Sequence, residues 1–112
     1  MTDHLQELVD RWRWWISWSD QVFDDRDLSA SARVIAYMIS RHANVITNLA
    51  TVSKGRLVRQ SGISKRALDN AIADLEQRGH LSITRHRRPG KRKNDENTYQ
   101  LIMIMSEEIP FE

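Results

Sequence analysis

Basic side chains are concentrated in one part of this 112-residue sequence. Residues 54–93 hold twelve of the seventeen lysines and arginines and only three acidic residues, so this stretch carries a net charge of +9. The rest of the chain has five basic and twelve acidic residues and a net charge of −7, although the whole chain carries only +2. A basic block between acidic ends is typical of a protein that binds a polyanion such as a nucleic acid.

The sequence lacks the residues and motifs that several other kinds of chemistry require. The absence of cysteine excludes disulfides, cysteine-ligated zinc and thiol catalysis. The four histidines lack zinc-ligand spacing, so we expect them at the surface or in a loop. There is no serine elbow, phosphate-cradling glycine loop or pair of catalytic carboxylates. We therefore expect no enzyme, no metal, no cofactor and no small-molecule ligand.

The sequence also indicates where the chain resides. No apolar run approaches the roughly 20 residues that a membrane span needs, and the first residues do not form a signal peptide. We expect a soluble cytoplasmic protein with no membrane partner.

An N-terminal helix is predicted from apolar residues at helical spacing, with Asp3 and Gln6 as an approximate capping box. Trp14 and Trp18 lie one turn apart on the side of this helix opposite to its main apolar stripe, and they are candidates for a homodimer interface. In the alternative, the helix is covered on both sides within one chain. The stripe that we expect to face the core consists of Leu5, Leu8, Val9, Trp12, Trp15 and Ile16.

A second helix is expected to begin near Asp27 or Ser29 and to run to about His42. The β-branched and aliphatic residues of 45–52 then allow a very short strand.

Serine and glycine mark the next two helices. Ser53 can cap a short helix that ends near Gln60, and Gly62 provides the positive φ of a tight turn. Ser64 can cap a longer helix that Gly79 ends. The apolar residues of this longer helix recur at helical spacing and should be buried: Leu68, Ala71, Ile72 and Leu75.

After Gly79 the apolar period changes from 3.6 to 2. Alternating runs that begin at Leu81 and at Tyr99 predict two strands. The polar loop over 88–97 contains a Pro-Gly pair, so the two strands should form a hairpin.

Three segments resemble winged helix-turn-helix DNA-binding domains. Residues 56–68 (RLVRQSGISKRAL) are similar to the L-A-x-x-x-G-x-S-x-x-T-V core of MarR- and GntR-type regulators and of phage and plasmid replication proteins. Residues 71–81 (AIADLEQRGHL) resemble the L-E-x-x-G-x-I that leads into the wing, and residues 97–101 (NTYQL) resemble the N-x-Y-x-L return strand of the replication proteins. The sequence departs from these patterns at Val58, Ala67 and Asn70, and the last two changes remove common phosphate contacts.

The resemblance implies an α+β winged helix-turn-helix, with a three-helix core, a two-stranded β-hairpin wing and an extra Trp-rich N-terminal helix. It divides the chain into an N-terminal helix and linker (1–26), a DNA-binding domain (27–105) and an acidic tail (106–112).

In such a fold the helix over 64–78 enters the major groove of double-stranded DNA. Arg66 can bind guanine, Asn70 can bind adenine, and Asp69 can accept from a cytosine amine or orient Arg66. Lys54 and Arg56 suit phosphates, and the cations of the hairpin can follow the backbone or enter a minor groove. The full set of expected DNA contacts is Lys54, Arg56, Ser64, Lys65, Arg66, Asp69, Asn70, Arg87, Arg88, Lys91, Arg92 and Lys93.

The resemblance leaves three functions open. A small transcriptional regulator, associated with a bacterial nucleoid, would bind an inverted repeat as a dimer. A replication-initiation module of a phage or plasmid would bind direct repeats. A winged helix can also act as a protein-interaction module, because a fold alone does not fix a function.

Overall fold

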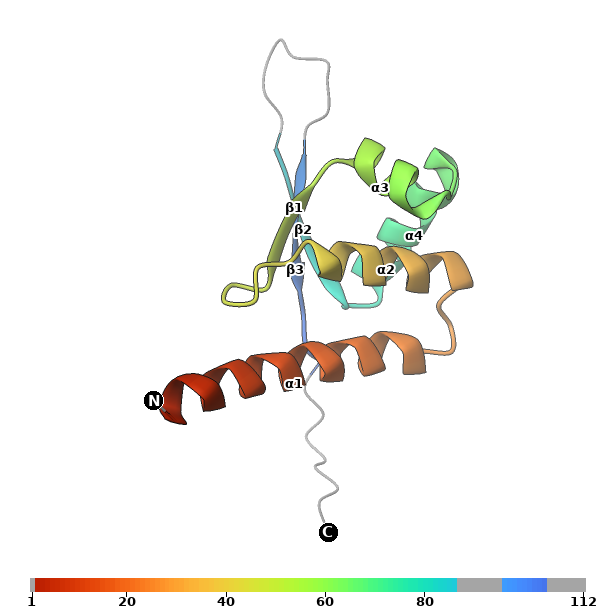
Figure 1. Ribbon diagram of the computed structural model, residues 1–112. Helices are drawn as coiled ribbons and strands as arrows, with labels where there is room; N and C mark the ends of the chain where they lie inside the picture. The colour runs from red at the N-terminus through yellow and green to blue at the C-terminus, as the bar shows by residue number, and fades with distance from the viewer. Residues whose placement is uncertain (1, 87–95, 105–112) are drawn as a thin grey trace.

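The structure, a computed structural model, describes residues 2–86 and 96–104. Within these residues, the chain forms four helices and three strands (Figure 1). None of the described helices is long and apolar enough to cross a membrane. The elements are α1 (Thr2–Asp24), α2 (Ala30–Arg41), β1 (Leu49–Val52), α3 (Lys54–Ser61), α4 (Lys65–Gln77), β2 (Leu81–Arg85) and β3 (Asn97–Leu101).

Serine side chains begin three of the helices. Ser29, Ser53 and Ser64 each precede a helix, and the hydroxyl oxygen of each accepts a hydrogen bond from the backbone N–H three residues later. These bonds satisfy an N–H that has no partner within its own helix. Gly79 follows the end of α4 with a φ of 85°, and the N–H of His80 returns to the carbonyl of Leu75 at 3.0 Å. The predicted boundaries of α2, α3 and α4 are confirmed.

The three strands form one antiparallel sheet in the order β1-β3-β2. The predicted antiparallel pairing of β2 and β3 is confirmed. The short strand expected within 45–52 is β1, which pairs with the other edge of β3. Asn97 pairs with Val52 on one side and with Arg85 on the other. These three residues therefore mark one end of the sheet, from which the chain continues through Ser53 into α3.

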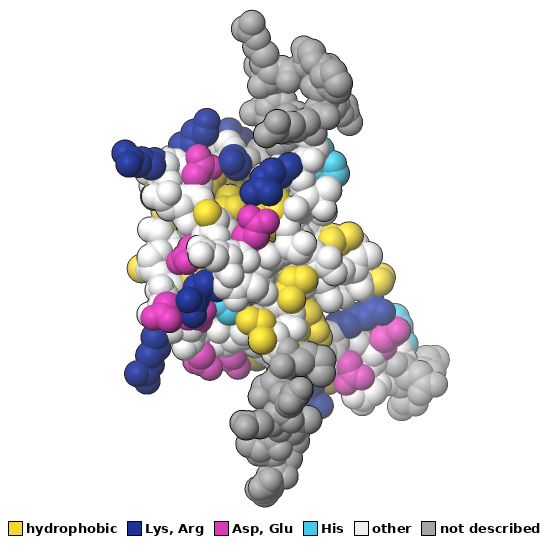
Figure 2. Space-filling model, turned by 180° about the vertical axis from the view of Figure 1, so that it is seen from behind, with side chains coloured by type: hydrophobic (Ala, Val, Ile, Leu, Met, Phe, Trp, Pro, Cys, Tyr) yellow, Lys and Arg dark blue, Asp and Glu magenta, His cyan; other side chains and the backbone are white. Residues whose placement is uncertain are grey.

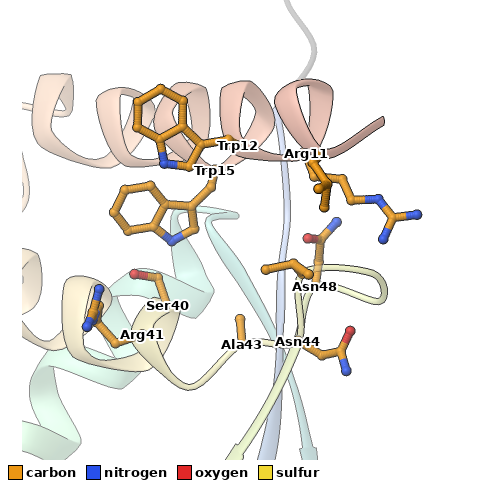
Figure 3. Close-up of a pocket in the computed structure, with 10 residues that line it drawn as sticks. Arg11, Trp12, Trp15, Ser40, Arg41, Ala43, Asn44 and Asn48 are labelled. Carbon is orange, nitrogen blue, oxygen red and sulfur yellow. The ribbon is translucent and has the colours of Figure 1, made fainter. Parts of the chain in front are cut away.

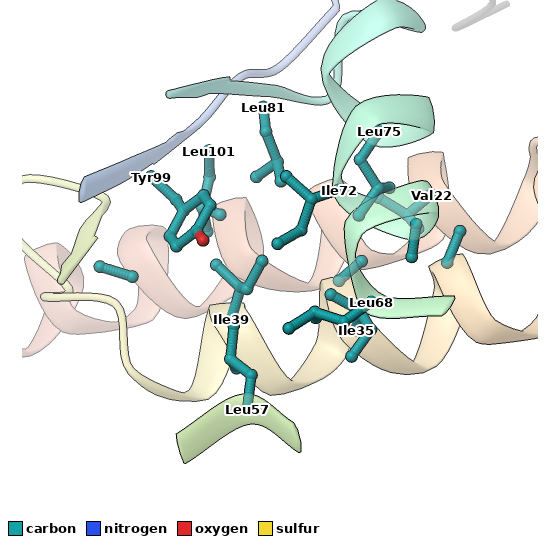
Figure 4. Close-up of a cluster of buried hydrophobic side chains, with 14 of the residues drawn as sticks. Val22, Ile35, Ile39, Leu57, Leu68, Ile72, Leu75, Leu81, Tyr99 and Leu101 are labelled. Carbon is teal, nitrogen blue, oxygen red and sulfur yellow. The ribbon is translucent and has the colours of Figure 1, made fainter. Parts of the chain in front are cut away.

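The core lies where the helices meet the sheet, and side chains from α1, α2, α3, α4, β2 and β3 converge there (Figure 4). The predicted buried stripe of α4 is confirmed. The largest fully buried side chains are Trp18, Tyr99, Ile35, Ile39, Leu57, Leu68, Leu75 and Val22.

The orientation of α1 is opposite to the sequence prediction. Trp18 is only 1% exposed, and its indole Nε1 donates to the carbonyl of His80 at 3.1 Å. Trp14 is partly buried against the same core, whereas Trp12 is 65% exposed. The prediction that Trp14 and Trp18 face outward as a dimer interface is therefore wrong. The physical reason is that α1 is apolar on both sides, so its apolar pattern alone fits either orientation. In the structure, the indole of Trp18 and the side chain of Val22 occupy the core.

A polar cluster fastens α1 to the rest of the fold. The amide of Gln21 donates through Nε2 to the carbonyl of Ile102 at 3.0 Å and accepts through Oε1 from the N–H of Ile104 at 2.7 Å. His80 is 2% exposed, so its predicted surface position is wrong. Its Nδ1 lies 2.9 Å from Nε2 of Gln21, and its Nε2 lies 2.8 Å from Oδ2 of Asp25. The cluster joins α1 to the turn after α4 and to the segment after β3.

The carboxylate of Asp25 is the charged centre of this cluster. A hydrogen bond from the Arg78 guanidinium holds the pKa of Asp25 well below its ordinary value of 3.8, against the effect of burial, and His80 acts in the same direction as Arg78. The same contact raises the pKa of Arg78. Because the folded state keeps Asp25 ionised at lower pH than the unfolded state does, this stabilisation is present above the ordinary pKa and is lost on acidification.

We predict that Asp25→Asn removes part of the acid sensitivity of the fold. The free energy of unfolding of the original protein should fall as the pH decreases from about 4 toward ~2, because Asp25 is protonated more readily in the unfolded state. The variant should be less stable at neutral pH and should lose less stability over that acid range. Urea unfolding followed by tryptophan fluorescence measures both effects, and Asp24→Asn, at an exposed position, is the control. Equal acid dependence of Asp25→Asn and the original protein would contradict the prediction.

Candidate nucleic-acid interface

The turn between α3 and α4 has the geometry of a helix-turn-helix. Gly62 has a φ of 74°, and its N–H donates to the carbonyl of Val58 at 2.9 Å. The N–H of Ile63 then donates to Oγ of Ser61 at 3.1 Å. A Cβ placed on Gly62 would meet nothing within 4 Å, so the backbone conformation, rather than a lack of space, requires glycine here.

The packing of α4 determines which of its side chains face the solvent. Leu68 and Leu75 are fully buried. On the opposite side Ser64, Lys65, Arg66 and Asn70 are exposed, as the sequence prediction requires of residues that bind DNA. The first turn of α4 thus presents two cations and exposed backbone N–H groups, which favour an anion.

Lys54 and Asp69 contact each other, although the sequence analysis predicts a separate DNA contact for each of them. Nζ of Lys54, at the start of α3, lies 2.9 Å from Oδ1 of Asp69 on α4. Asp69 therefore neutralises a nearby lysine and joins the two helices, and the structure does not bring it into contact with Arg66.

The outer side of α3 adds a cation that the sequence reasoning did not single out. Arg56 and Arg59 are both exposed, three residues apart on the same helix. Nη1 of Arg59 lies 3.4 Å from the position of a Cβ on Gly55, so the guanidinium folds back over the first turn of α3. The spacing of the two arginines, opposite the buried Leu57, was the signal that could have identified Arg59.

The roots of the hairpin lie at the same end of the sheet as the start of α3. Val52, which leads into α3, is separated from Arg85 by Asn97 alone in the strand register. Arg85 lies 3.4 Å from Oε1 of Glu76, and Nε2 of His86 lies 2.8 Å from Oγ1 of Thr98. The five predicted hairpin contacts lie outside the described residues: Arg87, Arg88, Lys91, Arg92 and Lys93. Figure 2 shows Lys and Arg side chains gathered over the end of the molecule that carries α3.

The buried Tyr99 lies beneath this charged end. Burial raises the pKa of its hydroxyl, while a hydrogen bond from Asn97 and the charges of Lys54 and Arg85 act in the opposite direction. Nδ2 of Asn97 donates to the Tyr99 hydroxyl at 3.2 Å. Asn97, Tyr99 and Leu101 all point inward, so the three named positions of the N-x-Y-x-L motif form part of the core.

A groove of about 520 Å³ runs beside the outer face of α4. Ser29 and Ser31 at the start of α2 form one wall, and Asn70 and Gln77 of α4 form the other. Small side chains at this surface leave room for a close approach by another molecule. Among the described residues, no group of three His, Asp or Glu side chains is placed to hold a metal ion.

Comparison with solved structures decides the fold. BpsR of Bordetella bronchiseptica, a MarR-family winged-helix regulator, superposes with a TM-score of 0.50 at 17% sequence identity, over 91% of this chain and 64% of that chain. The fold is a winged helix. In BpsR, 6-hydroxynicotinic acid regulates DNA binding. This winged helix spans about 64% of the length of BpsR. No family model and no curated protein sequence matches it.

We predict opposite effects of alanine at two glycines of this winged helix. Gly62→Ala should destabilise the fold by about 1–2 kcal/mol, because an L-residue is strained at positive φ. Gly55→Ala is the matched control and should stabilise the fold by about 0.5–1 kcal/mol, because glycine inside a helix is entropically costly and only the flexible Arg59 would have to adjust. Urea unfolding measures both. Equal destabilisation at the two positions would contradict the claim that the positive φ is the reason why position 62 requires glycine.

Proposed function

We propose that this chain binds double-stranded DNA sequence-specifically and acts as a small transcriptional regulator. The observation that carries the proposal is the exposed cationic first turn of α4, which is held outward by the buried stripe on the opposite side of the helix. The fold that it shares with BpsR supports the same function. In the sequence, a segment that contains a proline, a glycine and five further cations connects β2 to β3.

In the proposed complex α4 enters the major groove, which is about 12 Å wide. Arg66 binds the O6 and N7 atoms of guanine, and Asn70 binds the N6 and N7 atoms of adenine. Lys65 and Ser64 contact phosphate at the helix N-terminus. Arg56 and Arg59 of α3 contact the flanking backbone, since both are exposed on the helix that braces α4.

The ion pair of Lys54 and Asp69 changes the expected charge of this surface. Because Asp69 neutralises Lys54, the pair contributes little net charge toward the DNA. The phosphate contacts then come from Arg56, Arg59 and Lys65, together with the cations of residues 87–93.

Binding to duplex DNA should depend steeply on salt. Neutralising about five or six phosphates predicts a slope near −5 in a plot of log affinity against log salt, at about −0.9 per contact. Fluorescence anisotropy with a labelled random duplex, at several salt concentrations, measures this slope. An affinity that stays constant between low and physiological salt, or no binding at low salt, would contradict the proposal and would favour a protein-interaction module.

Two arginines should respond differently to substitution. Arg66→Ala should cost about 1–3 kcal/mol on the preferred site and relax the preference at one base pair, because a bidentate contact to guanine is lost. Arg56→Ala should weaken binding to all duplexes similarly and reduce the salt slope by about 1, because only a phosphate contact is lost.

Selection from a random duplex pool, followed by anisotropy on selected and mismatched sites, separates the two effects. Arg26→Ala, at an exposed position between α1 and α2, is the control and should leave both quantities unchanged. If Arg66→Ala lowers the affinity for every sequence equally, Arg66 contacts phosphate and the proposed reading of guanine is wrong.

A further inference from the structure

The outer face of α1 carries an apolar stripe that no described residue of the chain covers. Its members are mostly well exposed, with Leu5 at 63%, Trp12 at 65% and Phe23 at 48%. The inner face of the same helix is filled by Trp14, Trp18 and Val22. A helix that is apolar on both sides is normally covered on both sides. The stripe consists of Leu5, Val9, Trp12, Ile16 and Phe23.

The spacing of the stripe indicates what covers it. From Leu5 to Ile16 the intervals are four, three and four residues, and Ser19 continues the alternation to Phe23. The stripe therefore covers 18 residues in five steps, which keeps it on one side of a straight helix along almost the whole of α1. A face of this length and straightness suits lengthwise packing against another helix.

We propose that this face is a homodimer seam, in which α1 packs antiparallel against α1 of a second copy of the chain. The charges along the stripe favour this orientation. One edge of the stripe carries Arg13 and Asp20, which have opposite charges and are two turns apart. In an antiparallel pair each edge meets the same edge of the second copy, so Arg13 and Asp20 attract each other across the two-fold axis.

The other edge of the stripe is apolar and carries Leu8 and Trp15. Both residues line a pocket of about 370 Å³ between α1, the end of α2 and the segment before β1, and Figure 3 shows the rings of Trp12 and Trp15 beside it. Trp15 also packs edge-on against Tyr37 with the ring centroids 6.3 Å apart, so this side of the seam is held in place. A parallel pair would place the charged edge against this apolar edge. The antiparallel pair instead brings the two apolar edges together.

The dimer would give the proposed DNA-binding surface two-fold symmetry. Two copies of α4 related by a two-fold axis match the symmetry of an inverted repeat. Only this consequence rests on the proposed function, because the association of two α1 helices does not require DNA.

Analytical ultracentrifugation of the intact chain tests the seam. The original protein should sediment as a dimer at micromolar concentration. Trp12→Asp should raise the dissociation constant of the dimer by about 30-fold or more, as expected when a central tryptophan of an interface is replaced by a charge. Val34→Asp is the matched control, because Val34 is 43% exposed on α2 outside the stripe, and it should leave the dimer intact. Circular dichroism confirms that each variant is folded.

Exchange of the two rim charges tests the orientation. Arg13→Asp and Asp20→Arg should each weaken the dimer, and the double variant should restore it. A monomeric original protein, a dimeric Trp12→Asp variant, or a double variant weaker than both single variants would overturn the proposal.

DNA binding separates a failure of the seam from a failure of the proposed function. Trp12→Asp should keep the affinity for a single half-site and lose affinity for an inverted repeat. If neither protein binds DNA but the original sediments as a dimer and Trp12→Asp does not, the seam stands and the proposed function is wrong. If both bind DNA equally and neither dimerises, the seam is wrong and the function stands.

Discussion

The burial of one side of α4 is the constraint on which the rest of the structure depends. Leu68, Ile72 and Leu75 fill the space between α2 and the sheet, so α4 cannot rotate about its axis without bringing charged side chains into the core. Burying an unpaired charge costs far more free energy than new contacts of the rotated helix could return. The cationic first turn of α4, with Lys65 and Arg66, is therefore exposed as a result of core packing. Gly62 and the two serine caps then fix where that turn lies relative to α3.

Most of the fold from Ser29 to Leu101 follows from local signals, because each element there has a single apolar face and a clear boundary residue. The orientation of α1 does not follow, since this helix has two apolar faces and its periodicity supports either one. The choice is made by contacts over long sequence distances, such as Trp18 with the carbonyl of His80 and Gln21 with Ile102. The two partners of such a contact lie far apart in the sequence, so no local pattern predicts it. The burial of His80 escaped prediction for the same reason.

The candidate site shows the same division between local and long-range information. The exposure of Lys65, Arg66 and Asn70 could be predicted, because these residues lie on the side of α4 that is opposite to its buried stripe. The ion pair of Lys54 and Asp69 could not, because it depends on how α3 crosses α4. The inward position of Asn97 and Tyr99 also shows that residues of a motif shared with DNA-binding proteins can contribute to packing, since these two residues bond to each other inside the fold.

The proposed DNA-binding surface can be mapped most directly by NMR, by following the backbone amides of the labelled protein during titration with a short duplex at low salt. We expect the largest shifts in the first turns of α3 and α4, around Arg56 and around Lys65 and Arg66. The amides near Leu5 and Trp12 on α1 should change little. Shifts centred on α1, or no shifts at saturating duplex, would contradict the claim that the outward side of α4 is the surface that recognises DNA.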